Sequence, residues 1–120
     1  MKLKKVKIVV EEVDSTKRRW VSALRGKRTG SGTAVISVPS WEVLGKVLSP
    51  PRLAILAAVP WLKPASIAAL AKALGRDFKN VHGDVTFLAQ VGLLVLRETG
   101  ARRTLVPTAL YSEIDLPLAG

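Results

Sequence analysis

A run of hydrogen-bonding side chains between positions 79 and 90 is the part of this chain that could do chemistry. At helical spacing these residues share one face or its flanks: Lys79, Asn80, His82, Gly83, Thr86 and Gln90. The opposite side carries Val81, Val85 and Leu88, which are aliphatic and need burial. A helix with a packed back and a hydrogen-bonding front has what is needed to read base edges in a DNA major groove.

The same composition argues against a catalytic or metal centre. His82 is the single histidine and the chain has no cysteine, so it has no disulfide, no thiolate ligand and no Cys nucleophile. The adjacent carboxylates Glu11 and Glu12 fall in a predicted strand and would point to opposite faces. We therefore expect no enzyme, no metal site and no cofactor, and we expect the polar face to serve binding.

The elements that must position this face begin at Ser66, a residue type that favours a helix N-cap. The apolar face of that first helix consists of Ile67, Leu70, Ala71 and Leu74. Gly75 predicts the left-handed end of the helix, and Asp77 can cap a second helix over residues 77–92. The sequence therefore predicts two helices joined by a tight turn.

A predicted hairpin follows the second helix. Residues 93–96 and 102–106 are its expected strands, and Gly100 lies in the turn. A helix–turn–helix followed by a hairpin is a winged helix, with the wing at 97–104. The wing residues expected to hold DNA phosphates or reach the minor groove are Arg102, Arg103 and Thr104.

The first 39 residues predict a strand–helix–strand extension. Residues 2–11 alternate between apolar and charged, 14–27 form an amphipathic basic helix, and 34–38 are a β-branched strand. This order fits either a small βαβ unit or two strands that pair across a dimer. The lysines of the first strand are either a solvated edge or phosphate contacts. The basic side of the helix is either a solvent-exposed face or a second contact to the DNA backbone.

Two helices are expected between this extension and Ser66. Ser40 caps the first, and Ser49 with two prolines starts the second. Residues 60–65 predict a turn, and 110–118 predict a last strand. The apolar residues assigned to the core here are Trp41, Leu53, Leu56, Ala57 and Trp61, with Val59 as a further candidate.

The whole chain is thus expected to be α+β. We divide it into an N-terminal extension over 1–39, a winged helix–turn–helix over 40–109 and a C-terminal strand or tail over 110–120. With 19 Lys and Arg against 9 Asp and Glu, its formal charge of +10 favours a polyanionic partner. No signal peptide or membrane span is evident, so we expect a cytoplasmic protein without a membrane partner.

The segment 48–96 resembles small prokaryotic winged-helix regulators of the MarR-like or ArsR-like kind, some of which are antitoxin components. Three motifs carry the resemblance: LSPPRLAIL at 48–56, SIAALAKALGR at 66–76, and NVHGDVTFLAQVGLL at 80–94. Gly83 departs from the pattern, since many relatives have a basic residue there. The resemblance implies sequence-specific DNA binding, homodimerisation and gene regulation, and it allows a toxin or other protein partner.

The remaining charged and aromatic residues admit structural as well as binding roles. Asp84 is expected to form a salt bridge with Arg76 or Arg52, and Arg76 either pairs with it or contacts a phosphate. Phe78 and Phe87 are expected to pack on neighbouring helices. The full set of candidate DNA-binding residues is Ser66, Arg76, Lys79, Asn80, His82, Gly83, Thr86, Arg102, Arg103 and Thr104. The alternative function is a protein-interaction module, such as the antitoxin of a toxin–antitoxin pair.

Overall fold

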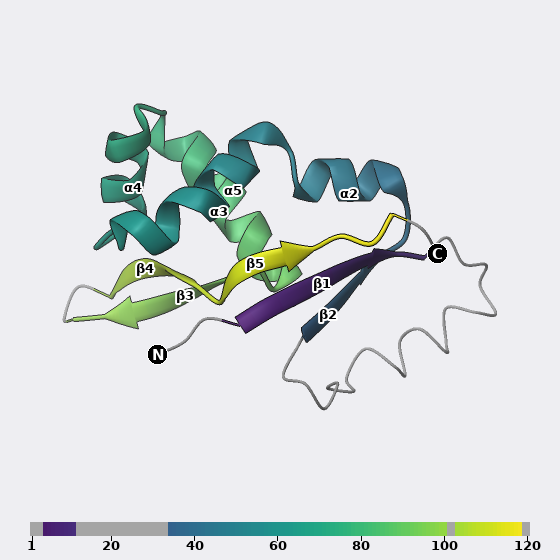
Figure 1. Cartoon of the computed structure of the whole chain (residues 1–120). Helices are drawn as coiled ribbons and strands as arrows, with labels where there is room; N and C mark the ends of the chain where they lie inside the picture. Colours follow the sequence, from purple (N-terminus) through teal and green to yellow (C-terminus); the bar gives the residue numbers. More distant parts are fainter. Residues whose placement is uncertain (1–3, 12–33, 101–102, 119–120) are drawn as a thin grey trace. The chain divides into compact units, whose positions relative to one another are not determined.

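The computed structural model describes residues 4–11, 34–100 and 103–118 (Figure 1). It divides into two compact units, Met1–Lys46 with Tyr111–Gly120, and Val47–Leu110. The described elements follow in the order β1 (Lys4–Val10), β2 (Ala34–Val38), α2 (Trp41–Val47), α3 (Pro50–Leu62), α4 (Ile67–Leu74), α5 (Phe78–Val91), β3 (Leu94–Thr99), β4 (Thr104–Ala109) and β5 (Tyr111–Asp115). The mixed α+β class is confirmed.

The first unit contains a three-stranded parallel sheet in the order β2-β1-β5. β1 and β2 pair in parallel within one chain, with Ile8 beside Ile36. This pairing is the one that a βαβ unit requires, and it differs from the alternative in which the two strands pair across a dimer. A parallel pair needs a crossover of a dozen or more residues, and the segment between the two strands is long enough. The helix expected over 14–27 lies outside the described residues.

β1 is the central strand of this sheet, because β5 pairs along its other side. The interpretation of its lysines as a solvated edge is therefore wrong. Lys5 is in register with Glu113, and Lys7 with Asp115. Each of these two lysines of β1 therefore lies beside a carboxylate residue of β5. Val6 and Ile8, on the opposite face of β1, are fully buried. The C-terminal strand thus belongs to the N-terminal sheet and is not a separate tail.

The second unit packs α3, α4 and α5 with the antiparallel hairpin β3–β4. Its helices contribute one or more fully buried aliphatic residues each, and these make the centre of the core: Ile55, Val59, Leu70, Val81, Val85 and Leu88. The hairpin adds Leu94 and Pro107, which are also buried. This core fixes the inner side of α5 and thereby determines which of its residues face outward.

Most residues expected to begin or end a helix do so in the structure. The Ser66 hydroxyl accepts the Ala69 N–H at 3.0 Å, and Gly75 ends α4 with φ 65°. Ser40 accepts the Val43 N–H at 3.1 Å before α2. Asp77 occupies the N-cap position of α5, but its side chain forms no capping hydrogen bond. The two helices and the turn between them are confirmed.

α3 differs from its prediction in length and in its buried face. It passes through Pro60 to Leu62, so the expected turn begins three residues later. Pro60 has no N–H to donate to the carbonyl four residues earlier, so α3 continues to its last residues without that one hydrogen bond. Val59 faces the core, as its candidate place predicts, together with Ile55 one turn earlier, whereas Leu53 and Ala57 are exposed.

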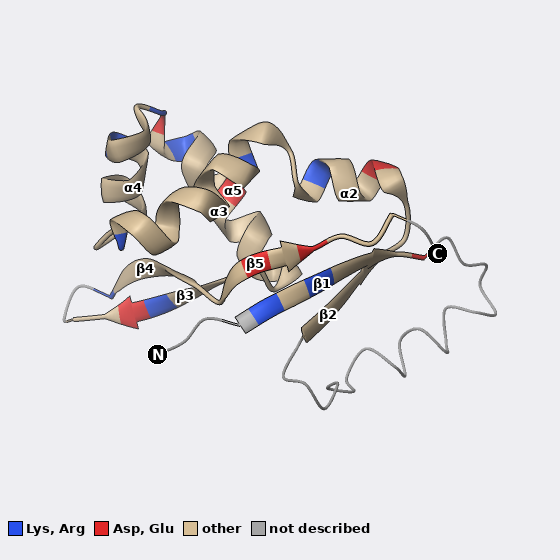
Figure 2. Cartoon of the chain, in the orientation of Figure 1, with Lys and Arg blue, Asp and Glu red and all other residues tan. Residues whose placement is uncertain are grey.

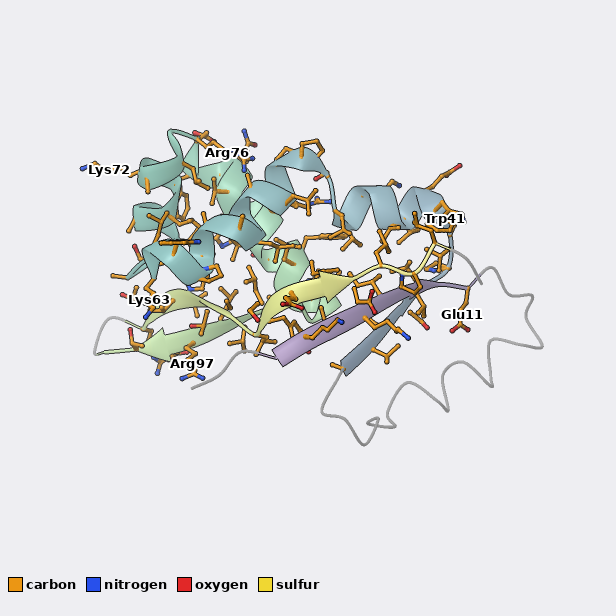
Figure 3. All side chains as sticks on the ribbon, viewed as in Figure 1. Glu11, Trp41, Lys63, Lys72, Arg76 and Arg97 are labelled. Carbon is orange, nitrogen blue, oxygen red and sulfur yellow. The ribbon has the colours of Figure 1, made fainter. Side chains whose placement is uncertain are left out.

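The assignment of Trp41 and Trp61 to the core is also wrong. Trp61 is 89% exposed and Trp41 is 47% exposed. In Figure 3, Trp41 lies at the beginning of α2. Because α3 is almost entirely apolar, its outward side must also carry apolar residues, and Trp61 is on that side.

The hairpin is longer than predicted. Its register runs from Leu94 beside Ala109 to Thr99 beside Thr104. Gly100 follows with φ 71°, a left-handed conformation that glycine adopts without a steric penalty. Arg103 has φ 52° and donates its N–H to the Gly100 carbonyl at 3.3 Å.

Among the described residues, no single helix is both long and apolar enough to cross a bilayer; only α2 and α3 taken together, across the break between them, reach that length and composition.

Candidate functional site

α5 separates an apolar back from a polar front, as the sequence predicts. Val81, Val85 and Leu88 have no exposed surface. The exposed residues on the other side and its flanks are Lys79, Asn80, His82, Gly83 and Gln90. Since the buried residues recur every three or four positions, the front is held outward by the core itself and needs no other support.

An open hollow of about 600 Å³ lies along this front. It is lined by Arg52, Lys79, Asn80, His82, Gly83, Asp84, Thr86, Phe87 and Gln90. Five of the ten candidate DNA-binding residues therefore share one surface: Lys79, Asn80, His82, Gly83 and Thr86. Their side chains offer an ammonium, an amide, an imidazole and a hydroxyl, which between them donate and accept hydrogen bonds.

Gly83 is not required by packing. A Cβ atom placed on it would have no heavy atom within 4 Å, apart from its own helix and chain neighbours. The helix backbone is consequently uncovered at this point of the front. A glycine inside a helix costs roughly 0.5–1 kcal/mol relative to alanine, so at this position the residue weakens the helix without any steric reason within the fold.

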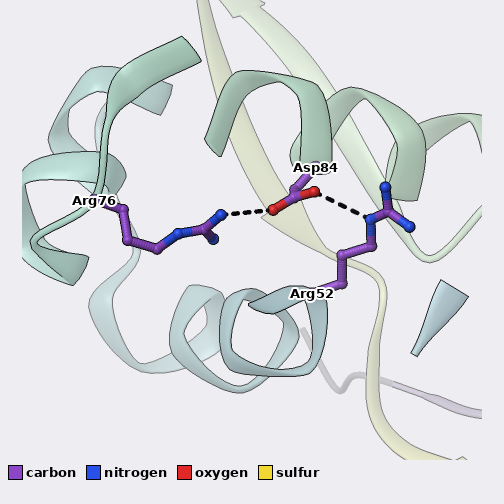
Figure 4. Close-up of polar contacts among 3 residues, drawn as sticks. All are labelled: Arg52, Arg76 and Asp84. Atoms are coloured by element: carbon purple, nitrogen blue, oxygen red, sulfur yellow. Dashed lines mark hydrogen bonds and ion pairs between the residues drawn. The ribbon is translucent and has the colours of Figure 1, made fainter. Parts of the chain in front are cut away.

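Asp84 binds two arginines from different elements (Figure 4). Its Oδ1 accepts Nε–H of Arg52 at 3.1 Å, and its Oδ2 accepts Nη2 of Arg76 at 2.9 Å. The exposed side-chain fractions are 17% for Asp84, 22% for Arg52 and 28% for Arg76. The expected salt bridge is confirmed with both partners, and it ties α3 and the α4–α5 turn to α5.

Phe87 holds the same Arg52 from another direction. The guanidinium carbon of Arg52 lies 4.0 Å from the centroid of the Phe87 ring, a distance at which the cation and the ring attract. Phe87 thus contacts a neighbouring helix, as predicted. Phe78 is half exposed and its ring lies 5.6 Å from the ring of His82 on the same helix, and its packing on a neighbouring helix stays a prediction.

The other candidate residues that the structure describes do not line the hollow. Ser66 is occupied as the N-cap of α4, and Arg76 is not among the residues that line the hollow. Arg103 is 85% exposed on the hairpin, 3.7 Å from Glu98, and Thr104 begins β4. Arg102 lies outside the described residues. Their roles in binding DNA remain predictions.

The structure adds Arg52 to the site, and sequence reasoning did not include it. Its salt bridge with Asp84 was expected, but the local sequence gives no signal that Arg52 lines the hollow, since it is three residues into an apolar helix and more than thirty positions from α5 residues such as Asp84. Gln90 also lines the hollow. Its place on the polar face follows from helical spacing, although it was not among the ten candidates.

The second unit carries a positive charge that suits an anionic partner. Its sequence has eight Lys and Arg against three Asp and Glu. Figure 2 shows the described charges spread over the helices and the hairpin, and Figure 3 shows Lys63, Lys72 and Arg97 pointing outward. A positive surface of this kind attracts polyanions over a range set by the ionic strength.

A family model matches residues 47–116. The chain belongs to the HVO_A0114 family. The match spans all of the second unit and continues through β5, so the α5 front, the hairpin and the Asp84 salt bridges lie in the part that defines HVO_A0114 membership. Neither the curated proteins nor the solved structures that were compared give a match.

Proposed function

We propose that this member of the HVO_A0114 family is a sequence-specific double-stranded DNA-binding protein that regulates transcription. In this proposal α4 and α5 are the helix–turn–helix, and β3–β4 is the wing of a winged helix. The observation that carries the proposal is the division of α5 into a fully buried back and a polar front with an open hollow.

The front of α5 enters a major groove and reads bases. Asn80 pairs with adenine through its amide, and Lys79 donates to guanine O6 or N7. Both side chains are exposed and line the hollow, which supports these roles. The wing over 97–104 contacts the backbone or the minor groove, with Arg102 and Arg103 as its cations. Ser66 and Arg76 keep their proposed places beside the DNA backbone.

The protein acts in the cytoplasm as a homodimer whose two α5 helices read half-sites about one helical turn apart, ~34 Å. The N-terminal strands β1 and β2 and the C-terminal strand β5 pair in one sheet. A dimer formed by this unit would therefore use the sheet as a whole. The mass of the full chain in solution, compared with that of a chain lacking residues 1–39, tests this assignment.

Selection of bound duplexes from a random pool tests the function and identifies the site in one experiment. We expect enrichment of a two-fold symmetric sequence. Lys79→Ala and Asn80→Ala should relax base preference at their own positions, each at a cost of roughly 1–3 kcal/mol. Lys72→Ala, on the exposed side of α4 and outside the hollow, is the matched control and should leave base preference unchanged. A pool that shows no enrichment would refute sequence-specific binding.

A second candidate function is a protein-interaction module, such as an antitoxin. The exposure of Trp61 and Leu53 on the outward side of α3 favours it, because large exposed apolar residues mark contact surfaces. The formal charge of +10 makes an acidic protein the fitting partner. Co-purification from cells that produce the chain tests this function. A stoichiometric complex with an acidic protein that is lost in Trp61→Ser would support it.

A further inference from the structure

Phe78 is the first residue of α5 and places an aromatic ring on the surface of the second unit. Its exposed fraction is 49%, so a large part of the side chain is open to solvent and the rest is left for its predicted packing on a neighbouring helix. Every other exposed residue of α5 is polar or glycine. Among the exposed residues of this helix, Phe78 therefore supplies the apolar side chain.

The Phe78 ring lies beside the hollow on the α5 front. Its centroid is 5.6 Å from that of the His82 ring, and the two planes are tilted by 37°, a geometry in the range of attractive aromatic pairs. His82 lines the hollow, as do Lys79 and Asn80, the two residues that follow Phe78 in the chain. Phe78 is not itself a lining residue, so its ring borders the hollow where α5 begins.

The place of Phe78 on the helix matters more than its exposure, because single apolar residues on a surface are common. In helix–turn–helix proteins the N-terminal residues of the recognition helix contact base edges, and Phe78 occupies the first position of α5. Its contact with the ring of His82 also limits its rotamers. A partner that packs against Phe78 therefore has less side-chain freedom to remove.

The major groove presents one apolar group that hydrogen bonds do not recognise. An A·T pair shows there N7 and N6 of adenine, O4 of thymine and the thymine 5-methyl group. The ammonium, amide and imidazole of the α5 front suit the polar atoms, whereas the methyl group suits an apolar side chain such as phenylalanine. Thr86 also has a methyl group, but it is less exposed and lies two turns further along α5.

We infer that Phe78 reads the 5-methyl group of a pyrimidine, ordinarily thymine, and is a specificity-determining residue. The inference rests on the proposed function and deepens it, because it adds one base to those read by Lys79 and Asn80. Packing the methyl group against the ring removes apolar surface of both from water, which stabilises the complex. Because the three residues are consecutive, the methyl group should lie within about two base pairs of the bases that Lys79 and Asn80 read.

Replacing thymine by deoxyuridine tests the inference on the wild-type protein, because uracil lacks only the 5-methyl group and forms the same base pair. The probe is the duplex that the full-length chain selects from the random pool, with each thymine replaced in turn. We expect one replacement in each half-site to weaken binding about threefold to fivefold. It should fall beside the positions whose base preference relaxes in Lys79→Ala and Asn80→Ala.

A second pair of probes separates the methyl group from the other groups of thymine. They carry cytosine or 5-methylcytosine at the sensitive position, and both lack the O4 acceptor of thymine. The 5-methylcytosine duplex should bind about threefold to fivefold more tightly than the cytosine duplex. Equal binding of these two duplexes would assign the preference for thymine to its hydrogen bonds and would overturn the inference.

Two variants assign the reading to Phe78. Phe78→Asn removes the apolar group and should bind the thymine and uracil duplexes equally, whereas Phe78→Leu keeps an apolar side chain and should keep most of the difference. Each comparison is made between two duplexes with one protein, so a change in the stability of the variant cancels. Thr86→Ser removes the competing methyl group and should keep the thymine–uracil difference of the wild type.

The outcomes distinguish this inference from the proposed function. If the wild type binds its selected duplex and no thymine replacement weakens binding, the inference is wrong and the proposed function stands. A difference that persists in Phe78→Asn, or that disappears in Thr86→Ser alone, would assign the methyl contact to another residue. If the wild type binds no duplex, the proposed function fails and the inference fails with it.

Discussion

Arg76 donates from Nη2 to Oδ2 of Asp84 across 2.9 Å, joining the turn between α4 and α5 to the middle of α5. The same carboxylate binds Arg52 of α3. One acidic residue thus fixes the angle at which three parts of the second unit meet. The buried stripe of α5 determines which side faces outward, and Asp84 holds the neighbouring elements beside it.

Removing this carboxylate should destabilise the fold. Asp84→Asn leaves two partly buried arginines without their counter-charge, and we expect a loss of about 2 kcal/mol in the free energy of unfolding. Glu98→Gln is the control, because its pair with Arg103 spans 3.7 Å and both side chains are largely exposed; it should cost less than about 0.5 kcal/mol. Urea denaturation measures both. Equal losses would show that the Asp84 bridges contribute no more than a surface pair.

The two helix glycines Gly83 and Gly45 should both tolerate alanine. Neither has a heavy atom within 4 Å of a Cβ placed on it, outside its own helix and chain neighbours, and alanine loses less conformational freedom on folding. Gly83→Ala and Gly45→Ala should each raise the free energy of unfolding by roughly 0.5–1 kcal/mol. A fall in the melting temperature of Gly83→Ala would contradict this expectation and would show that a side chain at position 83 makes an unfavourable contact.

The N-caps of α4 and α5 should differ in strength. Ser66 accepts the Ala69 N–H, whereas Asp77 forms no side-chain capping bond. Ser66→Ala should therefore cost about 1 kcal/mol of stability. Asp77→Ala loses only the attraction between its charge and the helix dipole, about 0.3–1 kcal/mol at low salt. Repeating the denaturation at high salt separates the two, since only the Asp77→Ala loss should shrink. A salt-sensitive loss at Ser66 would contradict the capping assignment.

The pairing of β1 with β5 should depend on charge. Lys5 and Glu113 are in register on neighbouring strands, and opposite charges placed so contribute roughly 0.2–1 kcal/mol. Lys5→Glu and Glu113→Lys should each lower stability, and the double exchange should restore most of the loss. A double-mutant cycle gives the coupling energy directly. A coupling energy of zero would mean that backbone pairing and the buried Val6 face hold β5 unaided.

Local signals made much of the second unit predictable. Ser66 and Gly75 bound α4 where their residue types indicate, and the alternation of polar and aliphatic residues on α5 gives its front and back without any knowledge of its neighbours. For the same reason five of the candidate site residues were found from spacing alone.

Long-range pairing and uniformly apolar segments were not predictable. β5 pairs with β1 across more than a hundred positions, and the local sequence of neither strand indicates which strand it pairs with. In α3 nearly every residue is apolar, so periodicity could not separate the buried Ile55 from the exposed Leu53 and Trp61. Arg52 was expected as a partner of Asp84, but its contact with Phe87 and its place beside the polar front of α5 were missed, because both depend on how two helices pack.

Duplex affinity of Gly83→Leu is the measurement that tests the central claim most directly. The Cβ of a leucine at position 83 would meet no heavy atom within 4 Å outside its own helix and chain neighbours, so we expect this variant to fold and to block close approach of DNA to the α5 front. Gly45→Leu, at an equally open helix glycine outside the second unit, is the matched control. We predict that the wild type and Gly45→Leu bind duplex with a steep salt dependence, while Gly83→Leu binds at least about a hundredfold more weakly. Equal binding by all three proteins would place the DNA elsewhere, and no binding by the wild type at low salt would contradict the account.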